Sequence, residues 1–77
     1  MERVQYEGYE IEVRTGQLRD DGRWTLDINI WRDSGSETAV TPFSSSTTFG
    51  TRDEAVQHCI NFGRQIIDGK VPGCTAP

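Results

Sequence analysis

Few residues in this chain could carry out chemistry, because it has only two cysteines and one histidine among 77 residues. Two cysteines make neither a disulfide framework nor a four-ligand zinc site, so we expect Cys59 and Cys74 to be free thiols. His58 and Cys59 are adjacent, and neighbours on a helix point in different directions, which argues against a base paired with a nucleophile. A glycine-rich phosphate loop is also absent. We therefore predict no catalytic residue, no metal, no cofactor, and a protein that is not an enzyme.

Long apolar segments are missing as well. No apolar run approaches the roughly 18 residues that cross a bilayer, and the first five residues lack the apolar segment expected of a signal peptide. We therefore expect a cytoplasmic protein without membrane contact. Lys and Arg number 8 against 12 for Asp and Glu, so the formal charge is -4. A surface of this charge repels phosphate, which argues against a nucleic-acid partner.

The length and composition fit a single small domain. Hydrophobic residues make up 34% of the chain, which is enough for one thin core. Residues 71–77 follow no hydrophobic pattern, and we expect them to form a flexible tail. We predict an α+β domain over residues 1–70, with a three-stranded antiparallel sheet packed on one C-terminal helix in the order βββα.

The first two strands are predicted from apolar residues that alternate with polar ones. Residues 9–13 alternate with period two, whereas Val4 and Tyr6 have the opposite parity. We expect Gly8 to host a bulge that joins both sets into one strand starting near Val4. A turn at residues 20–22 then leads into the central strand. Its buried residues are Trp24, Leu26, Ile28 and Ile30.

The third strand follows a second hairpin at Ser34-Gly35. A two-residue loop there would place Ile30 opposite Ala39, and the pairs Ile28–Thr41 and Leu26–Phe43 would follow. Pro42 cannot donate a ladder hydrogen bond, so this strand should be an edge of the sheet. Residues 44–48 all carry hydroxyl groups, and we expect an irregular connector there.

The helix is the best specified element. Thr51 can cap the amide of Glu54, the Glu54 carboxylate can reach back to the amide of Thr51, and Gly69 can end the helix. We expect Gly63 to let the helix approach a bulky sheet residue, either Trp24 or Tyr9. Two apolar stripes exceed what a small sheet can cover, which would leave part of the second stripe exposed for self-association. The stripe residues concerned are Val56, Ile60 and Ile67.

Trp31 is predicted to project into solvent from the face of the sheet away from the helix, which is unusual for so large an aromatic side chain. The predicted register places Thr38 across from it, Val40 diagonal to it and Glu12 beside it. In one interpretation the indole folds over its neighbours or is turned inward by a bulge. In the other, Trp31, Val40 and Pro42 form an apolar patch for a partner or a second copy. We expect the carboxylates of this face, including Glu12, to be solvated.

Four segments resemble a group of small bacterial α+β proteins of unknown function, and they cover most of residues 6–69. The resemblance implies the fold and no catalytic residue. The segments are Tyr6-Glu7-Gly8-Tyr9, Gly22-Arg23-Trp24, Phe49-Gly50-Thr51-Arg52-Asp53-Glu54-Ala55 and Gly63-Arg64-Gln65-Ile66-Ile67-Asp68-Gly69.

The Phe-x-Thr-x-x-Glu-Ala pattern at residues 49–55, after three strands, is also similar to the arm-type DNA-binding domains of phage integrases and to AP2 domains. That similarity implies a sheet set into the major groove. Glu10, Glu12 and Asp27 share or adjoin the face concerned, and each would meet phosphate with a like charge. The implied DNA-contacting residues are Arg14, Arg23, Thr25, Asn29, Trp31 and Arg32.

The preferred hypothesis is a non-enzymatic protein-interaction module that binds a protein partner or forms a homodimer. Its predicted contacts are Trp31 and Val40 on the sheet and Ile60 and Ile67 on the helix. The alternative is a DNA-binding domain of the AP2 or integrase-arm type that uses Arg14 and Arg23 near the hairpins. An enzyme would require a cleft around His58 or between two subunits.

Overall fold

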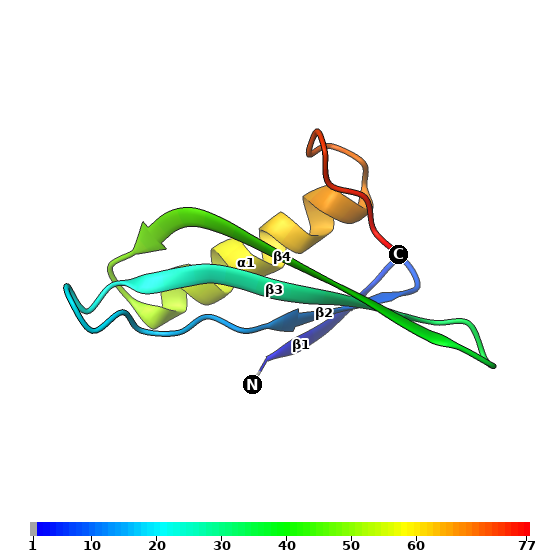
Figure 1. The fold of residues 1–77 in the computed structure, drawn as a ribbon, viewed down its shortest axis with the longest axis horizontal. Helices are drawn as coiled ribbons and strands as arrows, with labels where there is room; N and C mark the ends of the chain where they lie inside the picture. Colours follow the sequence, from blue (N-terminus) through cyan, green and yellow to red (C-terminus); the bar gives the residue numbers. More distant parts are fainter. Residues whose placement is uncertain (1) are drawn as a thin grey trace.

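The computed structural model describes residues 2–77 and shows one helix lying across one face of an antiparallel sheet (Figure 1). Met1, at the start of the segment considered for a signal peptide, lies outside the described residues. The α+β class with a single C-terminal helix is confirmed, but the sheet has four strands instead of three, in the order β1-β2-β3-β4. The elements are β1 (Arg3–Tyr6), β2 (Tyr9–Val13), β3 (Trp24–Asp33), β4 (Thr38–Phe49) and α1 (Arg52–Ile67).

The additional strand arises at Gly8, where the predicted bulge is wrong. Tyr6 pairs with Tyr9, so Glu7 and Gly8 form a two-residue hairpin turn in which φ is 50° and 81° respectively. Positive φ at both central residues defines a type I′ turn. Because Val4 pairs with Ile11, this hairpin places the two apolar sets of opposite parity on the same face. The change in parity that suggested a bulge therefore marks a reversal of the chain.

The hairpin between β2 and β3 turns at Gly22, as predicted. The Leu18 amide donates to the Arg23 carbonyl at 2.7 Å, and the Gly22 amide donates to the Leu18 carbonyl at 3.0 Å. Strand β3 is central, and Ile28 and Ile30 are fully buried on it.

The predicted register between β3 and β4 is wrong by two residues. Ile30 pairs with Thr41 and Ile28 with Phe43, because the loop spans residues 34–37 instead of two residues. The Gly35 amide donates to the Asp33 carboxylate at 2.9 Å, and this local bond favours the longer turn. A shift of two residues keeps every side chain on its predicted face.

Strand β4 is an edge strand, as the position of Pro42 predicted. It also continues through residues 44–48, where the sequence suggested a connector. Thr25 pairs with Thr48 but Leu26 pairs with Ser45, so β4 carries two extra residues at this bulge. The strand can continue here because threonine fits a pleated surface and the bulge absorbs the change of register.

Helix α1 begins at the predicted cap. The Glu54 amide donates to the Thr51 hydroxyl at 3.2 Å. The Glu54 carboxylate accepts from that same hydroxyl, also at 3.2 Å, and not from the Thr51 amide as predicted. The helix ends at Ile67, and Gly69 follows its C-cap residue Asp68.

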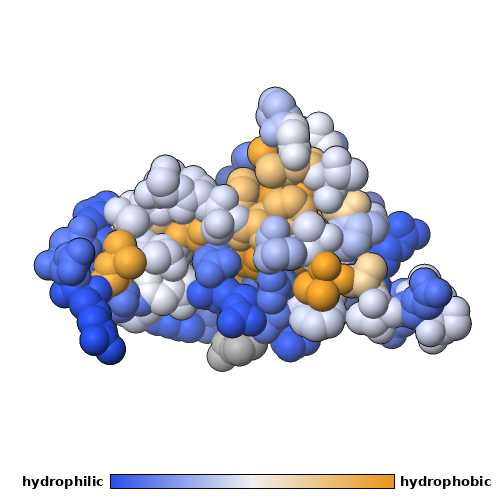
Figure 2. All heavy atoms as spheres, in the orientation of Figure 1, coloured by the Kyte–Doolittle hydropathy of each residue, from blue (hydrophilic) through white to orange (hydrophobic). Residues whose placement is uncertain are grey.

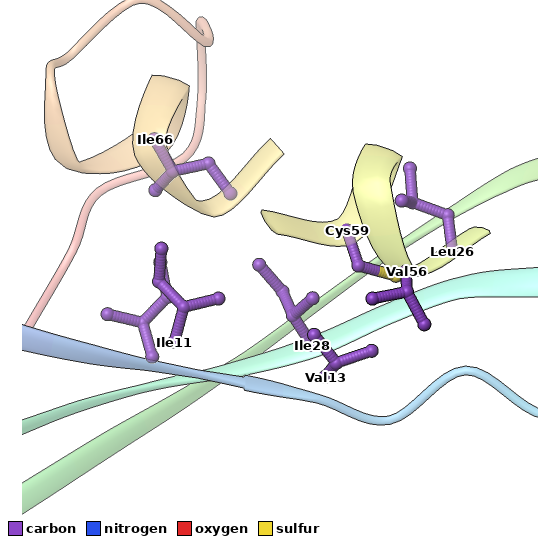
Figure 3. Packing of buried hydrophobic residues seen from close by; sticks show 8 residues of the cluster. Ile11, Val13, Leu26, Ile28, Val56, Cys59 and Ile66 are labelled. Atoms are coloured by element: carbon purple, nitrogen blue, oxygen red, sulfur yellow. The ribbon is translucent and has the colours of Figure 1, made fainter. Parts of the chain in front are cut away.

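The core lies between α1 and the three strands β2, β3 and β4. In Figure 3, Val56, Cys59 and Ile66 point from the helix toward buried residues of the sheet such as Ile11 and Ile28. Val56 is only 9% exposed, so its predicted exposure is wrong, while Ile60 and Ile67 are half-buried against the core. The helix packs across β2, β3 and β4, and these strands cover more of its second apolar stripe than predicted.

Gly63 does allow the helix to approach the sheet closely, but the residue beneath it is neither Trp24 nor Tyr9. A Cβ atom at Gly63 would lie 2.8 to 2.9 Å from three side-chain carbons of Ile11. Ile11 is fully buried, so its side chain has no solvent to move into.

The segment that follows the helix folds back onto the domain. Val71, Cys74 and Ala76 pack against the core, and the Tyr9 hydroxyl and the Arg32 guanidinium each donate to the Pro77 carbonyl at 3.3 Å. The flexibility of residues 71–77 in solution stays a prediction. Within residues 2–77, the one helix is too short and too polar to cross a membrane.

Candidate functional site

The candidate site lies on the open face, which we define as the side of the sheet opposite α1. Side chains alternate between the two faces along each strand, and Ile11, Ile28 and Ile30 face the helix. Their neighbours in sequence therefore face outward, and the strand pairing brings them together. The open-face residues at the centre of the sheet are Arg3, Gln5, Glu10, Glu12, Asn29, Trp31, Val40 and Pro42.

Glu12 is the buried centre of this face, although its place in the sequence predicted a solvated carboxylate. It is 4% exposed, because Trp31 and Asn29 of the neighbouring strand cover it. The Trp31 indole donates to its Oε1 atom at 2.8 Å, the Asn29 amide donates to the same atom at 3.2 Å, and the Arg3 guanidinium lies 3.6 Å from Oε2. These contacts, led by the bond from Trp31, hold the pKa of Glu12 below its ordinary value.

Trp31 is half-buried and fixed by the residues around it. Glu10 pairs with it on one side and Val40 on the other, so the predicted position of Thr38 opposite Trp31 is wrong. The Arg3 guanidinium carbon lies 5.9 Å from the centre of the indole ring, within the range of a cation–π contact. The indole thus folds over Glu12 through a hydrogen bond, and no bulge turns it inward.

A shallow hollow of about 500 Å³ opens beside Trp31, between the β1–β2 turn and the end of the β3–β4 hairpin. Its lining combines an aromatic ring with charged groups of both signs. Val40, which pairs with Trp31, is 45% exposed. The indole ring can contact the apolar part of a ligand's side chain, and the charged lining can bind a polar or cationic group of the same ligand. The lining residues are Arg3, Gln5, Gly8, Tyr9, Glu10, Trp31, Asp33 and Thr38.

The residues predicted to contact DNA do not form one basic surface. Arg23 donates from Nε and a terminal nitrogen to the hydroxyl and carbonyl of Thr48, at 2.7 and 2.8 Å, and so links the turn before β3 to β4. Arg32 lies on the helix side, with its guanidinium carbon 5.5 Å from the Tyr9 ring centre. Arg14 is exposed just beyond β2. DNA binding stays a prediction.

The two helix residues predicted as contacts lie on the other side of the sheet from Trp31. Ile60 and Ile67 pack against the core, so the structure does not bring them together with Val40. Ile60 lines a hollow of about 290 Å³ on the helix surface, together with His58 and polar neighbours. The His58 ring stacks on Phe49 at 4.4 Å between ring centres. The predicted residues therefore belong to two separate surfaces.

The residue that the sequence analysis missed as part of the site is Arg3. It approaches Glu10, Glu12 and the Trp31 ring at once, because β1 lies beside β2. With the predicted bulge at Gly8, residues 4–6 would have continued the first strand and Arg3 would have been distant. Treating Glu7-Gly8 as a hairpin turn would have placed Arg3 opposite Glu12.

The two thiols should differ strongly in reactivity. Cys59 is fully buried, and burial raises the pKa of its thiol, whereas Cys74 is half-exposed. Since the thiolate is the reactive form, we expect a disulfide reagent to modify Cys74 quickly in the folded protein and Cys59 only after unfolding. A Cys74→Ser variant should lose the fast phase. Rapid modification of that variant without denaturant would contradict the burial of Cys59.

Comparison with known families finds a match that covers nearly the whole chain. Residues 1–75 match DUF6566, a domain of unknown function. Comparison with curated proteins and with solved structures finds no match. The match extends from β1 through α1 into the tail, so the fold and the open face described above all lie within it. The chain therefore belongs to the DUF6566 family, a domain of unknown function.

Proposed function

We propose that this domain is a non-enzymatic protein-interaction module whose contact surface is the open face around Trp31. The observation that supports the proposal is the hydrogen bond from the Trp31 indole to the buried Glu12 carboxylate. This bond holds a large aromatic side chain in one orientation beside the exposed Val40. Aromatic residues held in this way are enriched among the few side chains that dominate the energy of protein interfaces.

The chemistry of the hollow narrows the kind of partner. Glu10 and Asp33 line it, and Arg3 is engaged with Glu10 and Glu12 within the domain. The whole chain carries a formal charge of -4. A partner segment that places an aliphatic side chain against Trp31 and a basic group near Asp33 would complement both the shape and the charge of this surface.

The proposal can be tested by comparing three variants as immobilised baits in a lysate of the source cells. Trp31→Ala removes the aromatic contact, and Val40→Glu places a charge beside it without removing a hydrogen bond from Glu12. Leu18→Ala is the matched control, because Leu18 is another exposed hydrophobic residue, 39% exposed, near the hairpin turn at Gly22. Quantitative mass spectrometry measures what each bait retains, and circular dichroism verifies that each variant is folded.

We expect the unmodified domain and Leu18→Ala to retain the same specific protein. The amount retained should be at least tenfold lower with Trp31→Ala and with Val40→Glu. Equal retention by all four baits would contradict an open-face contact. The purified domain is also examined by sedimentation, since the partner can be a second copy. A strict monomer that retains no protein through the open face would refute the proposed function.

A further inference from the structure

In the part of the chain that the structure describes, strand β4 leaves one long edge of the sheet unpaired. It is the outermost strand, and its 12 residues from Thr38 to Phe49 include no charged side chain. Edge strands present unpaired N–H and C=O groups, and proteins commonly protect them with charged side chains, proline or bulges. Here Pro42 and the bulge near Ser45 are the protecting features. The stretch before Pro42 has neither, so it is the part of the edge that can accept another strand.

The same stretch belongs to a hairpin that projects from the domain. Figure 1 shows the β3–β4 hairpin extending beyond the β1–β2 turn, and all of residues 32–40 are exposed. Figure 2 shows a small hydrophobic area near the base of this projection, bordered by hydrophilic residues. A two-stranded ribbon with both faces in water has little stability of its own. Pairing with a further strand would stabilise it.

The register determines which backbone groups point outward from β4. Bonded and non-bonded pairs alternate along an antiparallel ladder. The Ser34 amide donates to the Glu37 carbonyl at 2.9 Å, and counting from that pair places Asn29–Pro42 among the non-bonded pairs. The backbone groups of Thr38, Val40 and Pro42 therefore face away from β3. Since proline has no N–H, Thr38 and Val40 are the outward donors of this stretch.

We propose that a second copy of the chain pairs with this edge, antiparallel, about a two-fold axis at Val40. The inference goes beyond the proposed function, because it concerns the edge of the sheet instead of the open face around Trp31 and names a second copy of the chain as the partner. In this register the Val40 amides and carbonyls of the two copies satisfy one another, and each Thr38 amide meets the Pro42 carbonyl of the other copy. Both outward donors thus find acceptors, while the Thr38 carbonyl remains at an end that water can reach.

A register shifted by two residues toward Pro42 fits less well. It would place Val40 opposite Pro42 of the second copy, so each Val40 carbonyl would face a nitrogen without hydrogen. That would leave an unpaired acceptor in the middle of the interface, which costs about 1–3 kcal/mol when buried. The Val40-centred register also brings no charged side chains of β4 together, because the strand has none.

The symmetry limits the assembly to a dimer. An interface about a two-fold axis uses the same surface on both copies and is closed. The opposite edge of the sheet is β1, which has only four residues and carries Arg3. A short, charged strand is a poor template for further pairing.

Disulfide cross-linking tests the two-fold axis directly. In a Cys74→Ser background, a Val40→Cys variant places two thiols opposite each other, where bonded pairs have Cα atoms about 5.5 Å apart. Thr38→Cys and Ser44→Cys are matched controls, because their distances across the axis are about 13 Å or more at about 3.3 Å per residue. We expect mild oxidation to give mostly covalent dimer with Val40→Cys and little with either control. Equal cross-linking at the three positions would overturn the register.

Chemical synthesis offers a second test that keeps every side chain. N-methylation of the Val40 amide removes an outward donor, and N-methylation of the Ser44 amide removes one outside the proposed pairing. We expect N-methylation at Val40 to weaken dimerisation at least tenfold and N-methylation at Ser44 to leave it unchanged. Sedimentation measures the dimerisation constant of each protein. A domain that is monomeric at millimolar concentration overturns the edge proposal. If that monomer still retains a partner through Trp31, the proposed function stands without it.

Discussion

Replacing Gly63 with alanine is expected to lower the free energy of unfolding by about 2 kcal/mol, although alanine is the better helix former. The propensity gain is about 0.8–1.0 kcal/mol. The added Cβ, however, would lie 2.8 to 2.9 Å from three carbons of the Ile11 side chain, which is fully buried. Overpacking of a core typically costs about 1–3 kcal/mol, and contacts this short with a side chain that cannot move belong at the upper end.

A double-mutant cycle with Ile11→Ala separates the clash from other effects. Ile11→Ala alone should cost about 2–5 kcal/mol by leaving a cavity, but it removes all three carbons that the new Cβ would meet. The two changes together should therefore cost less than the sum of the single changes, measured by urea unfolding.

Gly16→Ala is the control for the loss of a glycine, because no atom of residues 2–77 lies within 4 Å of a Cβ at that position. Its stability should be within about 0.5 kcal/mol of the unmodified protein. Additive effects at Gly63 and Ile11 would mean that the two residues are not in contact.

Gly63 also illustrates how far the sequence specified the packing. Its place within the apolar stripe of the helix predicted a close approach to the sheet, and the geometry confirms that approach. The residue beneath it could not be predicted, because that depends on the strand order and on the angle between helix and sheet. Ile11 of β2 lies there, instead of Trp24 of β3 or Tyr9, which is two residues earlier on β2.

In the strands, the sequence predicted which face each side chain occupies but not the register or every turn. Alternation predicted the faces of β2 and β3 correctly, because a side-chain period of two is a property of the strand itself. The β3–β4 register failed because it depends on loop length, and the Asp33 side chain favours a four-residue loop. The sequence did not predict the turn at Glu7-Gly8, because glutamate is not among the residues that usually occupy the first position of a type I′ turn.

The errors in the β3–β4 register and at the Glu7-Gly8 turn both affected the predicted site. The sequence indicated Trp31 and Val40 as neighbours on the open face, and the structure places them directly opposite each other. It also placed Glu12 nearby but did not indicate its burial. That burial requires Asn29 and Trp31 to cover Glu12 while Arg3 approaches from β1, and Arg3 reaches it only in a four-stranded sheet.

Replacing Glu12 with glutamine is expected to lower the free energy of unfolding at pH 7 by about 1–3 kcal/mol. Glutamine keeps the size of the side chain and an acceptor oxygen, but hydrogen bonds to a charged group are stronger than those to a neutral one. Trp31 and Asn29 both donate to Glu12, so two such bonds are weakened. Glu10→Gln is the matched control on the same strand and face, and it should cost less than about 1 kcal/mol because Glu10 forms a partly exposed ion pair with Arg3.

The pH dependence distinguishes a charge effect at Glu12 from a packing effect. Its pKa is below the ordinary value of 4.5 in the folded protein, first because of the Trp31 hydrogen bond. The folded state therefore binds this proton less readily than the unfolded state. The resulting stabilisation is present above about pH 4.5 and is lost as the pH falls through the folded pKa.

Unfolding curves of the unmodified protein and of Glu12→Gln should thus be well separated at pH 7 and converge in acid. Glu2, whose pKa is lowered by its bond to Arg52, is present in both proteins and cancels in the comparison. A stability difference that stayed constant from pH 7 to pH 3 would show that Glu12 supports Trp31 by shape alone. Convergence would show that the stabilisation comes from the charge of Glu12, which strengthens the hydrogen bonds from Trp31 and Asn29 on the open face.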